Sequence, residues 1–115
     1  MDFKERVYSM LIVSASDKFN TSLAAIFPDF KYAPVLFEAS ISAAKRALVE
    51  REFDFVVISS PLPDDDGIRF SIDICSGKNS IVMLLIRNEI YASVFDKVSM
   101  HGVYTVPKPT SKQII

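Results

Sequence analysis

The sequence is poor in the residues that build redox, metal and cofactor sites. It has no tryptophan, three glycines, one cysteine (Cys75) and one histidine (His101). A single cysteine excludes an internal disulfide, and one cysteine with one histidine leaves too few ligands for a zinc site. Cys75 follows Ile68 and Ile72 at helical spacing, which favours a small buried side chain over a reactive thiol. We therefore expect no metal ion and no cofactor.

An excess of charge of one sign is also lacking. The chain has 13 basic and 14 acidic side chains and a net charge of −1, which gives no electrostatic footprint for nucleic acid or for an anionic membrane. The apolar or small run after the charged first six residues is only about seven residues long, too short for a signal peptide or a membrane span. We expect a cytoplasmic protein with no membrane contact, no small-molecule substrate and no direct nucleic-acid contact from this segment.

Apolar residues are abundant, and two kinds of segment alternate. They make up 50% of 115 residues, enough for the core of one domain over 1–115. Runs that are apolar on both faces, separated by helical patterns, predict a parallel sheet with helices on both sides. Right-handed crossovers make this a doubly wound α/β sheet. The expected strands are 7–13, 31–37, 55–58, 81–86 and 103–106, and the expected helices are 17–27, 40–51, 68–76 and 91–100.

The last residues have the pattern of a helix that is just beginning. Ile114 and Ile115 would be its first apolar positions, and the six residues 110–115 cannot cover the face of a sheet. We expect that this fifth helix is truncated and that any output domain lies beyond Ile115. An apolar strip left uncovered would promote association.

Polar residues of functional interest should gather at one edge of the sheet. Ligands of open α/β sheets bind at the carboxyl ends of the strands, near the switch in strand order. The informative positions are therefore 14–17, 59–67, 85–88 and 107–109.

Two motifs at these positions resemble bacterial response-regulator receiver domains. Residues 53–67 are similar to the family's third strand and the loop after it. In the family a phospho-accepting aspartate ends this strand, and a proline and an Asp-Gly pair follow it; Pro63, Asp66 and Gly67 match the proline and the pair. The pair Lys108 and Pro109 matches the family's closing Lys-Pro. The resemblance implies the flavodoxin-like receiver fold with strand order 2-1-3-4-5, and a cis Lys108–Pro109 bond.

The resemblance also implies which positions carry phosphoryl chemistry. An aspartate attacks the phosphoryl group, two acids help to hold Mg²⁺, a Thr or Ser acts as the switch with an aromatic partner, and a lysine neutralises the charge. Only the lysine is retained, as Lys108. The acceptor position falls on Ser59, and the acidic pair falls on Ser14 and Ala15. The switch falls on Leu85, and its aromatic partner falls on Thr105.

The remaining polar residues have plainer interpretations. Acids 64–66 are typical of a solvated turn, and Asp66 would be the N-cap of the helix that begins at Ile68. Asp17 suits the first turn of a helix, and His101 lacks a catalytic partner. Lys108 is either a surface lysine or the remnant of an anion site, and the sequence leaves both open.

The leading hypothesis is a pseudo-receiver, which is not an enzyme. It would mediate protein–protein interaction or homodimerisation in a bacterial response regulator or a transcription antitermination regulator. The resemblance is closest to degenerate receivers that precede an RNA-binding antiterminator (ANTAR) domain.

Two alternatives stay open. One is a phosphorylatable receiver whose acceptor is displaced, for example to Asp64, or is Ser59 itself. The other is a flavodoxin-like cofactor binder whose hydroxyl-rich first loop, with Ser14 and Ser16, would bind phosphate at a helix N-terminus.

Overall fold

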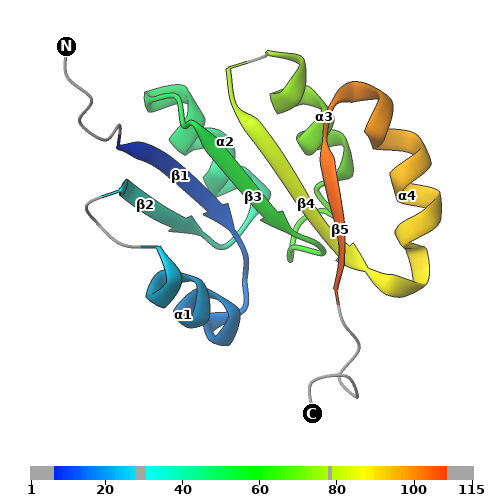
Figure 1. Ribbon diagram of the computed structural model, residues 1–115, viewed down its shortest axis with the longest axis horizontal. Coiled ribbons are helices and arrows are strands. Elements are labelled where there is room, and N and C mark those ends of the chain that lie inside the picture. Colours follow the sequence, from blue (N-terminus) through cyan, green and yellow to red (C-terminus); the bar gives the residue numbers. More distant parts are fainter. Residues whose placement is uncertain (1–6, 28–30, 78, 109–115) are drawn as a thin grey trace.

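Five strands form one parallel sheet in the order β2-β1-β3-β4-β5. The computed structural model describes residues 7–27, 31–77 and 79–108, and Figure 1 shows β1 between β2 and β3. This confirms the doubly wound α/β fold and the strand order. The strands are β1 (Tyr8–Val13), β2 (Tyr32–Glu38), β3 (Phe55–Ser59), β4 (Ile81–Arg87) and β5 (Tyr104–Lys108).

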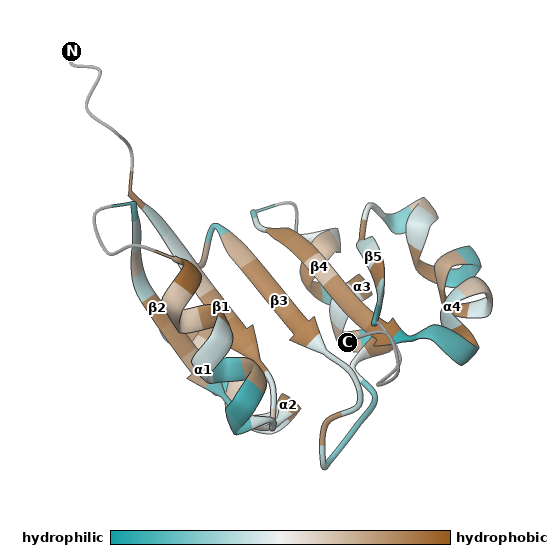
Figure 2. Cartoon of the chain, turned by 60° about the horizontal axis from the view of Figure 1, so that its bottom comes forward, coloured by the Kyte–Doolittle hydropathy of each residue, from teal (hydrophilic) through white to brown (hydrophobic). Residues whose placement is uncertain are grey.

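The helices divide unequally between the two faces of the sheet. On one face α2, α3 and α4 pack on the larger core cluster, whereas α1 covers the other face alone (Figures 1 and 2). None of the helices in the described ranges has the length and apolar character of a membrane span. The helices are α1 (Asp17–Ile26), α2 (Ile41–Glu50), α3 (Ile68–Ser76) and α4 (Tyr91–Val98), with single 3₁₀ turns η1 (Asn88–Ile90) and η2 (Ser99–His101) on either side of α4.

The central strands are buried because they are apolar on both faces. In β3, Val56 and Ile58 face the larger cluster and Val57 faces the α1 side, and all three are at most 8% exposed. Burying one such side chain contributes about 1.5–3 kcal/mol. The alternation also fixes the register, since a slip of one residue would exchange the two faces.

Serine side chains begin the first two helices. Ser16 Oγ accepts the Phe19 N–H at 3.2 Å, and Ser40 Oγ accepts the Ala43 N–H at 3.1 Å. Each bond satisfies an amide that the helix itself leaves without a partner.

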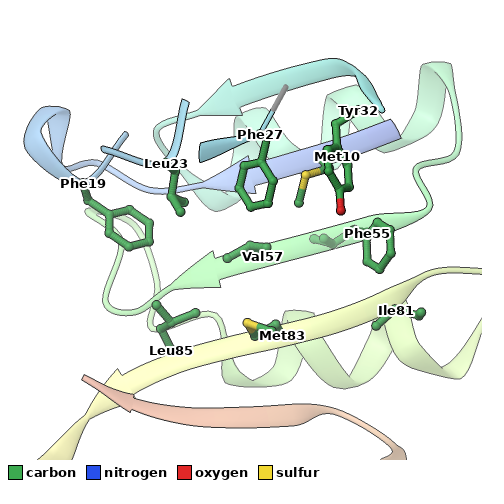
Figure 3. Close-up of a pocket in the computed structure, with 11 residues that line it drawn as sticks. Met10, Phe19, Leu23, Phe27, Tyr32, Phe55, Val57, Ile81, Met83 and Leu85 are labelled. Atoms are coloured by element: carbon green, nitrogen blue, oxygen red, sulfur yellow. The ribbon is translucent and has the colours of Figure 1, made fainter. Parts of the chain in front are cut away.

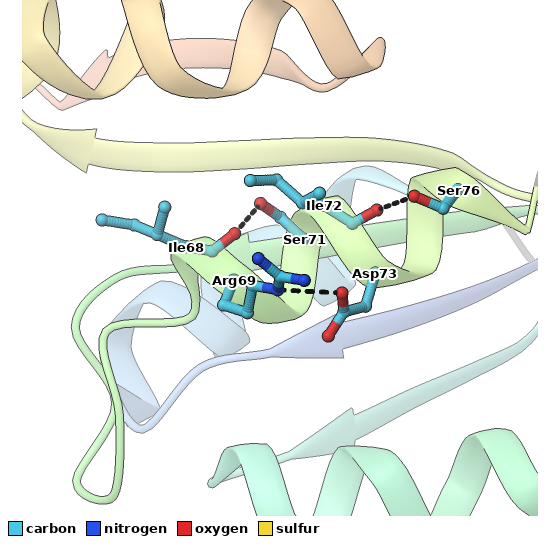
Figure 4. A network of polar contacts seen from close by, with 6 residues as sticks. All are labelled: Ile68, Arg69, Ser71, Ile72, Asp73 and Ser76. Carbon is cyan, nitrogen blue, oxygen red and sulfur yellow. Dashed lines mark hydrogen bonds and ion pairs between the residues drawn. The ribbon is translucent and has the colours of Figure 1, made fainter.

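Polar side chains of α3 are satisfied within the helix (Figure 4). The Ser71 hydroxyl is fully buried and donates to the Ile68 carbonyl at 2.6 Å, and Arg69 and Asp73 form an exposed ion pair at 3.1 Å. Helix α3 has the bounds expected from the sequence, and Gly77 is its C-cap residue.

The end of the chain differs most from expectation. Helix α4 stops at Val98, where the sequence predicted helix to residue 100, and η2 follows. Strand β5 continues to Lys108 because Pro107 and Lys108 still pair with Ile86 and Arg87 of β4.

The face that α1 covers is half open. Paired residues of parallel strands point to the same side, so Tyr104, opposite Met83, shares this face; their side chains are 63% and 38% exposed. Between α1 and β4 lies an apolar groove of about 290 Å³ (Figure 3). The truncated fifth helix expected over residues 110–115 lies outside the described ranges and stays a prediction. The groove is lined by Met10, Phe19, Leu23, Phe27, Tyr32, Phe55, Val56, Val57, Ile81, Met83 and Leu85.

Replacing Gly67 by alanine should destabilise the protein. Gly67 has φ +82°, and a Cβ there would lie 2.9 Å from Ile58 Cγ2. Left-handed backbone and a clash with a core side chain together predict a loss of about 1–3 kcal/mol, measured by urea unfolding. Gly77→Ala is the matched control, because Gly77 has φ −73° and its substitution should change stability by less than about 1 kcal/mol. Equal losses in both variants would contradict the prediction.

Candidate functional site

The carboxyl ends of four strands bring the residues of interest to one edge of the sheet. Ser59, at the end of β3, is the register partner of Leu85 in β4, and Lys108, at the end of β5, is that of Arg87. Ser14 directly follows β1 and is 1% exposed. The parallel order therefore assembles the positions that the sequence singled out.

The resemblance assigns the acidic pair to Ser14 and Ala15. The hydroxyl of Ser14 is already hydrogen-bonded, and Ala15 has only a methyl group. Ser14 Oγ accepts the Ser16 N–H at 3.1 Å, and the Ser14 carbonyl accepts from Asn20 Nδ2 at 3.4 Å. The Ser14 N–H donates to the Glu38 carbonyl at 2.9 Å. Ala15 is exposed and offers no ligand. Ser14 thus holds the loop that leads into α1.

The position that the resemblance assigns to the phosphoacceptor is a buried serine without a base. Ser59 is 7% exposed and Ser60 is 3% exposed. The Ser60 N–H donates to the Leu85 carbonyl at 3.0 Å, and neither serine hydroxyl has a hydrogen bond within the described part of the chain. His101 lies in η2, at the far end of α4, and is exposed. Among the described residues, no hydrogen bond links the Ser59 hydroxyl to a base that could activate it.

Lys108 has a protein partner that the sequence did not reveal. Its Nζ donates to the Ser60 carbonyl at 2.6 Å, which joins the end of β5 to the loop after β3. Burial lowers the pKa of Lys108, and the nearby charge of Arg87 lowers it further. A backbone carbonyl acceptor leaves no signal in the sequence. Pro109, and with it the expected cis Lys108–Pro109 bond, lies outside the described residues.

The two residues expected at the switch lie on opposite faces of the sheet. Leu85 lines the groove beside α1, whereas Thr105 is the register partner of Leu84 and so faces the α2–α4 side. Thr105 Oγ1 is buried and has no hydrogen-bond partner. These two side chains therefore do not form a coupled pair in this structure.

Asp64 caps a helix that is distant in the sequence. Its carboxylate accepts the N–H groups of Ile41 and Ser42 at 2.9 and 3.0 Å and the Ser42 hydroxyl at 3.1 Å. These bonds to the first residues of α2 hold the pKa of Asp64 below its usual value of 3.8. The carboxylate is thus committed to joining the loop after β3 to α2.

The other two acids of the run shape their own loop. Asp65 Oδ1 accepts the Gly67 N–H at 3.0 Å, and Asp66 Oδ1 accepts the Ile68 N–H at 2.9 Å. The expectation that Asp66 is the N-cap is off by one residue. Gly67 is the N-cap of α3, because its left-handed backbone turns the chain into the helix, and Asp66 binds the first helical amide from the position before it. Pro63 is exposed in the same loop.

The residues at this edge do not fit Mg²⁺, which prefers carboxylate oxygens in a tight octahedron. The three positions in question offer a serine hydroxyl that is already bonded, a methyl group and a second hydroxyl. Across residues 7–27, 31–77 and 79–108, no three His, Cys, Asp or Glu side chains are grouped so that they could hold a metal ion.

The chain is similar in fold to solved receiver domains. A signal receiver domain of an HD domain-containing protein from Pseudomonas fluorescens superimposes with a TM-score of 0.77 at 20% identity, over 92% of this chain and 78% of that one. The chain has the receiver fold.

Two further receiver domains are similar. One belongs to a sensor histidine kinase from Pseudomonas aeruginosa and holds a magnesium ion in its active-site cleft (TM-score 0.69, 18% identity, 90% of this chain and 87% of that one). The other is the beryllofluoride-activated NtrC4 receiver domain dimer, with a TM-score of 0.70 at 21% identity over 90% of this chain and 88% of that one. No protein-family model matches the chain, and no curated protein matches its sequence. At these identities the likeness is one of fold.

Asp64 should stabilise the protein only when it is ionised. Its pKa is lower in the folded protein than the usual 3.8, so its contribution is complete above pH 3.8 and is lost as the pH falls through the folded-state pKa. We expect Asp64→Ala to lower the melting temperature at pH 7 and to match the unmodified protein at the acid end of a pH series followed by circular dichroism. Asp96→Ala, on α4, is the control and should change little; a pH-independent effect of Asp64→Ala would contradict this account.

Proposed function

We propose that this chain is a pseudo-receiver, a cytoplasmic signalling module that acts by binding and not by phosphoryl transfer. The observation that carries the proposal is the make-up of the carboxyl edge. Ser14, Ala15 and Ser59 at this edge carry no carboxylate, the resemblance assigns the family's three acids to these positions, and Lys108 donates to the Ser60 carbonyl. The receiver fold supports a role in a response regulator. That this regulator controls transcription antitermination is a finer part of the proposal, which rests on the sequence resemblance alone.

The hydrogen bonds of the site favour this reading over a displaced acceptor. Asp64 is exposed, but its two oxygens accept three hydrogen bonds at the start of α2. Attack on a phosphoryl group would remove the charge that these bonds stabilise. The Ser59 hydroxyl has no hydrogen bond to a base in the part of the chain that the structure describes.

The first loop also gives little support to a phosphate-bearing cofactor such as FMN. Ser16 Oγ already accepts the Phe19 N–H, and Ser14 Oγ accepts the Ser16 N–H. The amides of this helix start that would cradle a phosphate are therefore partly occupied. A gain in stability on adding FMN would revive this alternative.

A surface suited to protein contact lies around α4 and the edge strand β5. Phe95 on α4 is 42% exposed, and Tyr104 and Val106 on β5 are 63% and 37% exposed, around a shallow hollow that includes all three. Exposed apolar groups gathered in this way are typical of interaction sites. The NtrC4 receiver domain, which has the same fold, is a dimer, and we propose that this chain also pairs with itself or with a protein partner here.

The proposal predicts no phosphorylation. Incubation with acetyl phosphate and millimolar Mg²⁺ should leave the intact mass unchanged, because positions 14, 15 and 59 carry no carboxylate and the Asp64 carboxylate is bonded to the start of α2. Mg²⁺ alone should shift the melting temperature by less than about a degree, since a ligand stabilises only what it binds. A phosphorylatable receiver treated in parallel serves as the positive control. An added phosphoryl group on Asp64 or Ser59 would instead establish the displaced-acceptor alternative.

Self-association should depend on α4. In sedimentation velocity at high concentration, the chain should form a dimer that Phe95→Asp weakens at least about tenfold, because a buried unpaired charge costs well over 1.4 kcal/mol. Val49→Asp is a matched control on α2, where Val49 is 86% exposed. A sedimentation profile that is strictly monomeric, or equal weakening by both substitutions, would refute homodimerisation through this surface.

A further inference from the structure

Strand β2 forms one edge of the sheet, and within residues 7–27, 31–77 and 79–108 only β1 pairs with it (Figure 1). The Ser14 N–H donates to the Glu38 carbonyl at 2.9 Å, so Glu38 directs its backbone toward β1. Successive residues of a strand direct their N–H and C=O groups to opposite sides, and those of Leu36 therefore also face β1. The backbone groups of Val35 and Phe37 consequently point to the open edge.

The open edge has room for a further strand. In the described part of the chain, no turn, cap or side chain bonds to the outward groups of Val35 and Phe37. Unpaired N–H and C=O groups in a row are a template for another strand. Hollows flank β2 on both faces, one of about 390 Å³ on the α1 side and one of about 440 Å³ on the α2 side. The side chains of an added strand would therefore have space on either face.

A second copy of β2, running antiparallel, would saturate this edge. Val35 of each copy would lie opposite Phe37 of the other, and each of these two pairs exchanges two N–H to C=O bonds. All the outward groups of both strands are then used, whereas a pairing centred on Val35 or on Phe37 forms only one such pair within residues 35–37. The saturated register places Leu36 on the two-fold axis. Pro34 would face Glu38, at a position where this pattern requires no N–H.

The side chains around the axis are compatible with their own copies. Leu36 lies on the α2 side, because its register partner Leu11 belongs to the larger core cluster, and it is 38% exposed. On the other face Val35 would meet Phe37, and a β-branched side chain opposite an aromatic one favours strand pairing. The hollow beside Leu36 holds two acids and two bases, so a two-fold axis can set opposite charges against each other. They are Glu38, Glu50, Arg46 and Arg51.

We propose that β2 pairs antiparallel with β2 of a second copy, so that two five-stranded sheets become one continuous sheet. The contact lies at the edge opposite β5, so it goes beyond the proposed function and does not depend on the α4 surface. One pair of short strands binds weakly, because association costs more freedom than a few hydrogen bonds return. The contact should therefore form at roughly millimolar concentration, which would let the module associate where it is locally concentrated.

Disulfide trapping tests this register. In a Cys75→Ala background at high concentration with oxidised glutathione, Leu36→Cys should form a linked dimer at least about tenfold faster than Glu38→Cys, because only the former meets disulfide geometry. The Cα atoms of a non-hydrogen-bonded antiparallel pair are about 4.5 Å apart. The two copies of residue 38 are offset by four residues and lie more than about 13 Å apart. Non-reducing electrophoresis measures both rates, and circular dichroism checks that both variants fold.

Hydrogen exchange tests whether the trapped dimer has paired backbones. In the oxidised Leu36→Cys dimer, the amides of Val35 and Phe37 should exchange more slowly than after reduction, because each gains an acceptor in the second copy. The amide of residue 36 is the internal control, since it already faces β1 and should change little. Two-dimensional ¹H–¹⁵N NMR follows the three amides in the same sample before and after reduction.

Three results would overturn the inference. They are no linked dimer, equal rates for Leu36→Cys and Glu38→Cys, or equal exchange of the Val35 and Phe37 amides in the oxidised and reduced forms. The first of these would leave the edge to a strand of another protein. Adding Phe95→Asp should leave the trapping of Leu36→Cys unchanged, so this contact and the α4 surface of the proposed function can fail separately.

Discussion

Parallel pairing of the central strands β1, β3 and β4 is the constraint on which the rest of the molecule depends. Their side chains are apolar on both faces, and burial of β1 and β3 on both sides and of β4 on the α2–α4 side holds one register. Because the strands run in the same direction, their carboxyl ends meet at one edge. That pairing places Ser59 opposite Leu85 and Lys108 opposite Arg87, so the core determines which polar groups become neighbours.

Removing carboxylates from such an edge changes more than the nucleophile. In a receiver that binds Mg²⁺, acids and metal balance one another, and the lysine adds a further positive charge. In this chain positions 14, 15 and 59 carry no acid, and the amine of Lys108 donates to the Ser60 carbonyl. This bond joins the end of β5 to the loop after β3. The edge also keeps Arg87 beside Lys108 with no negative partner within the described residues.

The loop between β3 and α3 is held by its own contacts. Asp64 reaches the start of α2, while Gly67 packs against Ile58 of the core, where no side chain would fit. In this structure the loop is thus tied to a helix on one side and to the sheet on the other. A loop fixed in this way does not need phosphorylation to order it, which agrees with a module that presents a constant surface.

The pattern of apolar segments by itself predicted the fold. Strands apolar on both faces, separated by helical spacing, determine a parallel doubly wound sheet, and α3 was predicted residue for residue. The sequence also shows that residue 59, which the resemblance assigns to the acceptor, is a serine; that assignment stays a prediction. Boundaries near α4 and β5 were less accurate, because pairing with β4, and not local composition, extends β5 to Lys108.

Only the tertiary structure decided the partners of the polar groups. Asp64 accepts the N–H of Ile41, 23 residues away, and Lys108 donates to the carbonyl of Ser60, 48 residues away. In both bonds the partner is a backbone group of a kind that nearly every residue carries. The proximity of Arg87 to Lys108 likewise follows from strand register. Sequence therefore determined the fold and the absence of acids, whereas long-range packing determined where the remaining charges lie, because hydrogen bonds to the backbone leave no trace in residue identity.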